Sequence, residues 1–202
     1  MDLGGLAAHE PRTIADEDRD AAVLVPIVER RDGPHLLFIK RGDHLGEHPG
    51  QMGFPGGGHE PRDATLRATA IREAGEEVGL RPSEVDFVGQ LDDTRTTSRY
   101  AVTPFVATVP DRTYVPDGRE VSEVAILPVA GLTDHENYEA ERREHPRYGE
   151  VLVHFFTVDG YTVWGATGRI LVQFLELATT WSPPSGVDWV VDPRADVRPD
   201  GD

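Results

Sequence analysis

The alternation of apolar and polar residues along the chain predicts several strands. Two β-rich runs, 21–30 and 34–40, flank the turn signal "RDGP" and are expected to form a hairpin. Further strands are predicted from the runs "DFVGQLDD", "AVTPFVATVP", "VSEVAILPV", "EVLVHFFTV" and "YTVW". Together with two helical segments, they predict an α+β fold, a mixed α/β sandwich.

Two segments carry helical periodicity. The first, 64–79, follows Asp63 as the expected N-cap and ends at Gly79. The second, 167–180, has Thr167 as its expected N-cap. One side of each helix is expected to face the core, through Leu66, Ile71, Ala74 and Val78 in the first and through Ile170, Leu171, Phe174, Leu175 and Leu177 in the second.

The two ends of the chain lack such patterns. Residues 1–20 are polar and irregular, and 183–202 form an acidic tail rich in proline and glycine. The length of 202 residues and the 38% hydrophobic content suit one domain with its own core. We therefore expect a single domain over 21–182, with both ends outside the core.

The charge of the chain is strongly negative. Acidic residues number 36 against 20 basic ones, the net charge is -16, and Lys40 is the only lysine. Such a surface repels nucleic acid and anionic membranes. The same composition suits a protein that stays soluble in a very salty cytoplasm, so a halophilic origin is a hypothesis.

The absence of cysteine excludes disulfides and thiolate chemistry. No run is long and apolar enough for a membrane span, and the first residues do not resemble a signal peptide. The expectation is a cytoplasmic protein that acts on small molecules.

The stretch "REAGEEVGL" concentrates carboxylates on one side of the first helix. Glu73, Glu76 and Glu77 stand at i, i+3 and i+4, a spacing that costs a few tenths of a kcal/mol per like-charged pair. One interpretation is a solvated acidic face. The other is a site for Mg²⁺ or Mn²⁺, which prefer carboxylate oxygens and complete their coordination with phosphate. The preceding loop "GQMGFPGGG" allows close approach of its backbone and favours the metal site.

This combination resembles the Nudix hydrolases, whose signature is G-x5-E-x7-R-E-U-x-E-E-x-G-U, with U an aliphatic residue. The second half matches from Arg72 to Leu80, with Ala74 in place of a larger aliphatic residue. In the first half the loop is one residue longer, which leaves Asp63 as the nearest substitute for the first glutamate.

The longer loop is similar to the branch of Nudix enzymes that hydrolyse coenzyme A. Its pattern L-L-T-x-R-S-x-x-L-R-x-H-x-G-x-x-x-x-P-G-G is matched from Leu37 to Gly57, with departures at Ile39, Gly42 and Gly46. Later stretches, among them "VWGATGRIL", also look like this branch. The resemblance covers roughly residues 21 to 180.

The resemblance implies roles for the carboxylates. Glu73 and Glu77 would bind metal directly, and Glu76 would join them directly or through water, with the backbone carbonyl near Gly57. Arg72 would orient the carboxylates by ion pairing. The base that accepts the proton of the attacking water is left open between Glu76, Glu120 and Glu123.

Substrate contacts are expected from two other segments. Arg41 follows a predicted strand and could grip a phosphate, whereas His48 could contact phosphate or hold the loop by a hydrogen bond. Arg95 and Arg99, in "DDTRTTSRYAVTP", are candidates for recognising the rest of coenzyme A, although an exposed polar loop explains that segment equally well.

The resulting functional hypothesis is a divalent-metal-dependent pyrophosphohydrolase. Its substrate would be coenzyme A or a derivative, cleaved to 4′-phosphopantetheine and adenosine 3′,5′-bisphosphate. The alternatives are a Nudix pyrophosphatase for another nucleoside diphosphate conjugate or a nucleoside triphosphate, and a Nudix-like binding module without catalysis. The presence of all three helix glutamates argues against the last of these.

Overall fold

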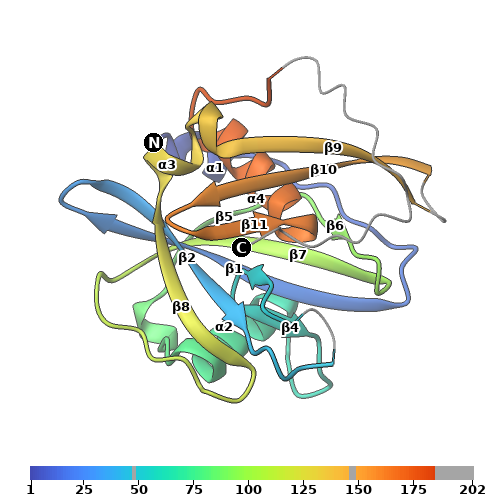
Figure 1. Ribbon diagram of the computed structural model, residues 1–202. Coiled ribbons are helices and arrows are strands. Elements are labelled where there is room, and N and C mark those ends of the chain that lie inside the picture. Colours follow the sequence, from blue (N-terminus) through green and yellow to red (C-terminus); the bar gives the residue numbers. More distant parts are fainter. Residues whose placement is uncertain (47–48, 146–148, 185–202) are drawn as a thin grey trace.

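The computed structural model describes residues 1–46, 49–145 and 149–184, and builds them into two β-sheets with helices packed against them (Figure 1). The strands are β1 (Arg19–Arg30), β2 (Gly33–Arg41), β3 (Met52–Gly53), β4 (Gly56–Gly58), β5 (Asp86–Gln90), β6 (Thr94–Arg95), β7 (Tyr100–Val109), β8 (Val121–Pro128), β9 (Tyr138–His145), β10 (Gly149–Val158) and β11 (Tyr161–Trp164). The α-helices are α1 (Leu3–Ala8), α2 (Leu66–Val78), α3 (Val129–Leu132) and α4 (Gly165–Ala178), with short 3-10 turns at Pro82–Glu84 and His135–Asn137.

The larger sheet is mixed, as the α+β prediction requires. Its central path is β3-β2-β1-β7-β5, while β4 pairs with β1, β6 with β7 and β8 with β2. The predicted hairpin is confirmed by the antiparallel pairing of β1 with β2, and β1 also runs parallel to β7. The smaller sheet is antiparallel in the order β11-β10-β9.

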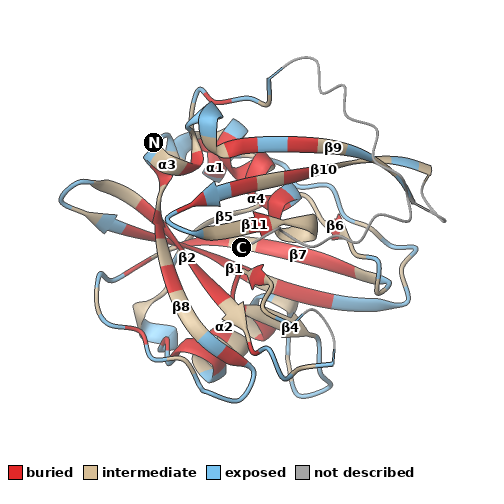
Figure 2. Ribbon diagram, viewed as in Figure 1, coloured by how far each residue is buried: buried red, intermediate tan, exposed pale blue. Residues whose placement is uncertain are grey.

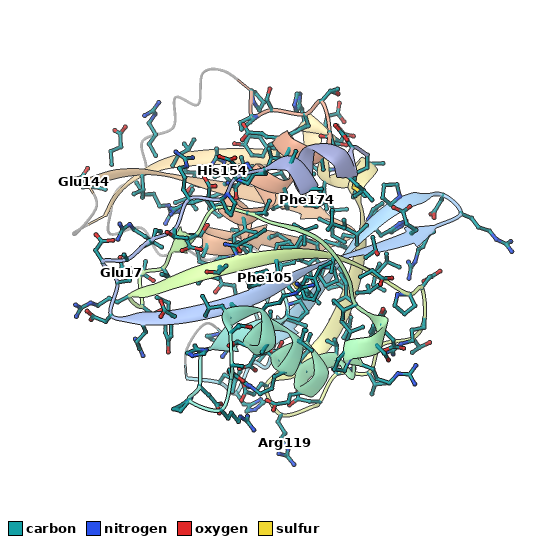
Figure 3. The ribbon with its side chains drawn as sticks, turned by 180° about the vertical axis from the view of Figure 1, so that it is seen from behind. Glu17, Phe105, Arg119, Glu144, His154 and Phe174 are labelled. Atoms are coloured by element: carbon teal, nitrogen blue, oxygen red, sulfur yellow. The ribbon has the colours of Figure 1, made fainter. Side chains whose placement is uncertain are left out.

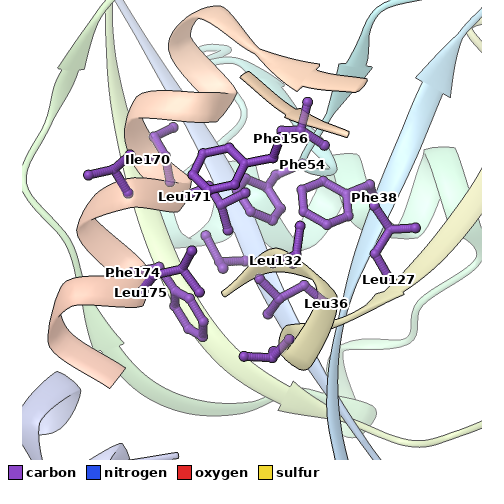
Figure 4. Packing of buried hydrophobic residues seen from close by; sticks show 14 of the residues in the cluster. Leu36, Phe38, Phe54, Leu127, Leu132, Phe156, Ile170, Leu171, Phe174 and Leu175 are labelled. Carbon is purple, nitrogen blue, oxygen red and sulfur yellow. The ribbon is translucent and has the colours of Figure 1, made fainter. Parts of the chain in front are cut away.

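Two hydrophobic cores lie on opposite faces of the larger sheet. One fills the space between the sheets and α4, and Figure 4 shows Phe38, Phe54, Phe156 and Leu171 meeting there. The other lies beneath α2 and includes Ala74, among other small residues. Figure 2 shows the buried residues concentrated along the central strands. The sheet is therefore the platform from which α2 is held.

Phe54 fixes the glycine loop to the first core. Its ring stacks on Phe38 with centroids 4.7 Å apart, and it is 4% exposed. Pro55 and β4 follow directly, and the backbone of Gly56 lies against β1, opposite Val23. A Cβ on Gly56 would come within 2.3 Å of the Ala22 carbonyl oxygen, so this close pairing requires glycine. The loop is therefore held in place before it reaches the helix.

The helix termini differ in part from the sequence-based expectations. The N-cap of α2 is Thr65, whose side chain accepts a hydrogen bond from the Ala68 amide, and not Asp63. Its C-terminal end at Gly79, with φ of 66°, is confirmed. Likewise α4 starts at Gly165, so Thr167 lies inside the helix and not at its N-cap. Asp63 is free for another role because Thr65 takes over the capping.

The N-terminal segment is part of the fold, so the expectation that 1–20 is irregular and lies outside the core is wrong. Asp2 caps α1 by accepting hydrogen bonds from the amides of Gly4 and Gly5. Leu6 is completely buried among residues of the first core, where α1 packs against β5 and α4. Burial of one leucine contributes about 1.5–3 kcal/mol, which is enough to hold a short helix that would not form alone.

At the other end, Trp181 is buried against the first core, and the acidic tail beyond 184 lies outside the described residues. None of the helices in the described ranges is long and apolar enough to cross a membrane.

Candidate active site

Glu77 is a buried carboxylate that joins α2 to the glycine loop. It is 5% exposed, and its Oε2 accepts a hydrogen bond of 2.9 Å from the Gly56 amide. Its pKa is raised to about 8, chiefly by burial; the Gly56 hydrogen bond opposes this shift, and repulsion from Glu73 and Glu120 reinforces it. The ionised form of Glu77 therefore lacks sufficient counter-charge.

Glu73 lies one turn earlier on α2, directly against Gly57. A Cβ on Gly57 would lie 2.5 Å from Glu73 Oε1, so a larger residue at this position would displace the carboxylate. Burial raises the pKa of Glu73, although Arg72, whose Nη1 lies 2.9 Å from Oε1, opposes the shift. Glu73 and Glu77 thus face the same loop from successive turns.

Arg72 is held by Asp63. Its Nε and Nη2 donate to the two carboxylate oxygens of Asp63 at 2.9 and 3.0 Å, and Nη2 also donates to the Gly58 carbonyl at 3.2 Å. The Asp63 side chain is only 4% exposed, and the hydrogen bonds from Arg72 hold its pKa well below the usual range. Arg72 therefore ties the loop and the carboxylates into one network.

Glu76 is 53% exposed, and it shares the Nη1 of Arg72 with Glu73. Its carboxylate accepts hydrogen bonds of 3.2 Å from Arg72 and from Arg62. A direct metal contact by Glu76 would require its side chain to leave these two arginines.

Arg41 ends β2 on the same side as α2, and its charge lowers the pKa of Glu77. Its Nε is buried and has no hydrogen-bond partner among the described residues. A buried donor without a partner costs free energy of about 1–3 kcal/mol. Such a group is suited to an oxyanion ligand, which would satisfy the donor and the charge together.

The candidate bases Glu120 and Glu123 face different sides of the sheet. Glu120 precedes β8, and its charge raises the pKa of both Glu73 and Glu77. Glu123 pairs with Lys40 in the β2–β8 register, and its carboxylate accepts a hydrogen bond from the Tyr161 hydroxyl of the smaller sheet. Glu120 therefore lies in the electrostatic neighbourhood of the buried carboxylates, and Glu123 is held on the opposite face.

The comparisons with known proteins agree with this geometry. The family model described as NUDIX domain matches residues 18–152, a span that contains the glycine loop, α2 and all of β8. The chain belongs to the Nudix family.

Its relatives include bacterial proteins called uncharacterized Nudix hydrolase NudL. The one from Enterobacter sp. is 38% identical over 76% of this chain and 79% of its own length, and the one from Yersinia enterocolitica is 36% identical over 82% and 85%. Among solved structures, a MutT/nudix family protein from Enterococcus faecalis has a TM-score of 0.52 at 14% identity, over 83% of this chain and 64% of that one. The last likeness shows the Nudix fold alone. The relatives show that this Nudix protein is a hydrolase.

The remaining predicted Nudix site residues lie elsewhere. Arg95 pairs with Asp16 and Glu17, at 2.6 Å in each case, and Arg99 pairs with Asp18 at 2.6 Å. Figure 3 places Glu17 beside the ends of β1 and β7, away from Arg119 and the carboxylate helix. His48 lies outside the described residues.

Nudix hydrolases generally use divalent ions such as Mg²⁺ or Mn²⁺, and the residues here fit one. Within the described ranges, no three carboxylate or imidazole side chains converge into a complete cation site. A Mg²⁺ site needs fewer protein side chains than three, because one or two carboxylates suffice when waters and substrate phosphates supply the other ligands. The carboxylate of Glu73, which lies against Gly57, and the raised pKa of Glu77 match this incomplete donor set.

Sequence reasoning missed three contacts of this Nudix site. These are the amide of Gly56 on Glu77, the pairing of Asp63 with Arg72, and the hydroxyl of Tyr161 on Glu123. The one-residue displacement of Asp63 in the signature was the only signal for any of them.

Proposed function

We propose that the protein is a divalent-metal-dependent pyrophosphohydrolase that cleaves coenzyme A or its derivatives. The observation that carries the proposal is the buried Nε of Arg41, which has no hydrogen-bond partner in the described part of the chain, near buried Glu77. Arg41 belongs to the stretch that is similar to coenzyme A hydrolases, whereas Glu77 belongs to the general Nudix helix. Their proximity combines a phosphate contact with the metal carboxylates in one site.

In this proposal Glu73 and Glu77 hold the metal, with the Gly57 backbone and, after rearrangement, Glu76. When bound, Mg²⁺ or Mn²⁺ supplies charge neutralisation of the pyrophosphate and lowers the pKa of a water. Arg72 orients Glu73, because its guanidinium is fixed by Asp63. The ion pair leaves Arg72 with a positioning role and no contact with the reacting atoms.

The protein residues then act on the two reactants. Arg41 binds a phosphate oxygen and holds the pyrophosphate in place. Glu120 accepts the proton of the attacking water; Glu123 is less suited because Tyr161 holds it on the other face of the sheet. Water adds to one phosphorus and the bridging P–O bond breaks, giving 4′-phosphopantetheine and adenosine 3′,5′-bisphosphate. Arg95 and Arg99 would contact substrate only if it displaced their acidic partners.

The competing function is hydrolysis of another nucleoside diphosphate conjugate or a nucleoside triphosphate, which the departures at Ile39, Gly42 and Gly46 favour. Incubation with coenzyme A, ADP-ribose and a nucleoside triphosphate, each with Mg²⁺ or Mn²⁺ in high salt, separates the two when products are resolved by phosphorus NMR. Preferential turnover of coenzyme A supports the proposal. Turnover of ADP-ribose or the triphosphate without coenzyme A would refute it.

A further inference from the structure

A groove of about 460 Å³ opens on the face of the larger sheet that carries α2. Its floor is formed by Val124 and Ile126 of β8, both of which pack against the core beneath α2. The segment 111–114 and Arg30 also line it. The groove plays no part in the phosphate chemistry described above.

The strand that lines the groove, β8, pairs with β2, the strand that ends at Arg41. In the register of β2 and β8, Val124 lies opposite Ile39 and Ile126 lies opposite Leu37. Ile39 and Arg41 share a face of β2 because alternate residues of a strand point the same way. With a rise of about 3.3 Å per residue, Val124 lies about 7 Å and Ile126 about 13 Å from Arg41 along the strand. A chain attached to a phosphate at Arg41 would reach both.

The strand beside the groove is an edge. Among the described residues β8 pairs only with β2, so its other side presents backbone amides and carbonyls without a strand partner. An extended ligand with amide groups can hydrogen-bond to such an edge in the manner of an added strand.

The cations of the groove are already neutralised. Arg30 Nε donates to Asp111 at 3.1 Å. Arg112 donates to both oxygens of Glu84, at 3.1 and 2.8 Å, and its guanidinium lies 4.4 Å from the centroid of the Tyr114 ring. The groove therefore offers amide partners and apolar surface, with no uncompensated positive charge for a further phosphate.

We infer that this groove binds the pantetheine arm of coenzyme A, whereas the adenosine 3′-phosphate end lies elsewhere. The arm is neutral and carries amide groups and a branched apolar segment. It extends from the pyrophosphate as a single chain. The inference rests on the proposed function, and it assigns Val124 and Ile126 as specificity-determining residues of the same site.

A second groove provides a matched control. It measures about 450 Å³ and is lined by the first turn of α2, including Leu66, and by Asp20 and Asp93. Leu66 is separated from Glu77 by roughly 16 Å of helix, from the rise of 1.5 Å per residue. Filling this second groove should therefore leave binding of the pantetheine arm unchanged.

The test compares Ile126→Trp, which fills the first groove, with Leu66→Trp, which fills the second. Titration calorimetry in the presence of Mg²⁺ measures binding of the two products separately. Ile126→Trp should lower the affinity for 4′-phosphopantetheine at least tenfold and change the affinity for adenosine 3′,5′-bisphosphate by less than twofold. Leu66→Trp should change neither affinity. Equal weakening of both products by Ile126→Trp, or no weakening of 4′-phosphopantetheine, would overturn the inference.

A measurement on the unaltered protein covers the case in which Ile126→Trp does not fold. With isoleucine methyl groups labelled by ¹³C, 4′-phosphopantetheine should shift the Ile126 signal and adenosine 3′,5′-bisphosphate should not; the reverse result contradicts the groove assignment. Failure of the proposed function looks different, because the unaltered protein would then leave coenzyme A intact. Hydrolysis of coenzyme A without any effect at Ile126 contradicts the groove alone.

Discussion

Asp63 and Arg72 form a bidentate ion pair with N–O distances of 2.9 and 3.0 Å. The pair is almost entirely buried. Asp63 stands one position before the place where the Nudix signature has a glutamate, and the longer glycine loop accounts for the displacement. The carboxylate is thereby used to hold Arg72, which in turn contacts Glu73. The departure from the signature thus becomes a structural connection between loop and helix.

Removal of Arg72 should destabilise the fold. Arg72→Met removes the counter-charge of the Asp63 carboxylate, which then keeps only its hydrogen bonds from Thr69 and the Glu60 amide, so the free energy of unfolding should fall. Urea denaturation measures the loss. The control is Arg81→Met, because Arg81 is 74% exposed in its pair with Glu84 and should cost less than about 1 kcal/mol. Equal effects of the two substitutions would contradict the buried pair.

The metal-free protein should lose stability as the pH rises from about 4.5 to about 8. In this range the unfolded chain has released the Glu77 proton and the folded chain retains it, because burial raises its pKa to about 8. The folded state binds more protons, so the free energy of unfolding falls with pH, by up to about 1.4 kcal/mol per unit.

Denaturation with a chelator present, at a series of pH values, measures this slope. Glu77→Gln cannot titrate and should flatten it, and added Mg²⁺ should stabilise the unaltered protein more at pH 8 than at pH 5. Identical pH profiles for the two proteins would show that Glu77 titrates normally.

Arg41 should contribute to substrate binding and contribute little to the stability of the fold. Its buried Nε makes no hydrogen bond among the described residues, so Arg41→Met should not lower the free energy of unfolding, and removal of the unpaired donor should raise it. Loss of the charge-assisted phosphate contact should lower kcat/KM about 10- to 100-fold. Arg31→Met, in the exposed turn after β1, is the control for removal of a charge. A large loss of stability without a change in kcat/KM would assign Arg41 to the fold.

Arg95 should act on stability. Its partner Glu17 has a completely buried side chain, so Arg95→Met should destabilise the protein more than Arg99→Met does. Arg99 is 57% exposed in its pair with Asp18, and Arg99→Met should cost less than about 1 kcal/mol. Steady-state kinetics with coenzyme A then tests the substrate role expected from the sequence. A tenfold rise in KM for Arg99→Met would show that Arg99 contacts the substrate.

The sequence pattern predicted those elements whose residues favour, by their own local preferences, the conformation that is found. The strands of the first hairpin and α2 are rich in residues that favour those structures, and each was found. The strand β9, "YEAERREH", was missed because its charged residues disfavour a strand. Tyr138 and Ala140 nonetheless face the core, and pairing with β10 overrides the local preference. The helix α1 was missed for a similar reason, since it depends on the burial of Leu6.

The same distinction holds in the candidate site. The spacing of Glu73, Glu76 and Glu77 places them on one side of a helix, and this could be derived from the sequence. Their different burial could not, because it depends on the path of the glycine loop. That loop covers Glu77, touches Glu73 and leaves Glu76 to the solvent.

In the proposed function, Glu77 serves metal-dependent cleavage of the coenzyme A pyrophosphate. The most direct test is phosphorus NMR of coenzyme A with Mg²⁺, comparing the unaltered protein with Glu77→Gln. The unaltered protein should convert the pyrophosphate signals into those of 4′-phosphopantetheine and adenosine 3′,5′-bisphosphate. Glu77→Gln should fold and lose at least about 100-fold in rate. Equal rates for the two proteins, or intact coenzyme A with both, would contradict the account.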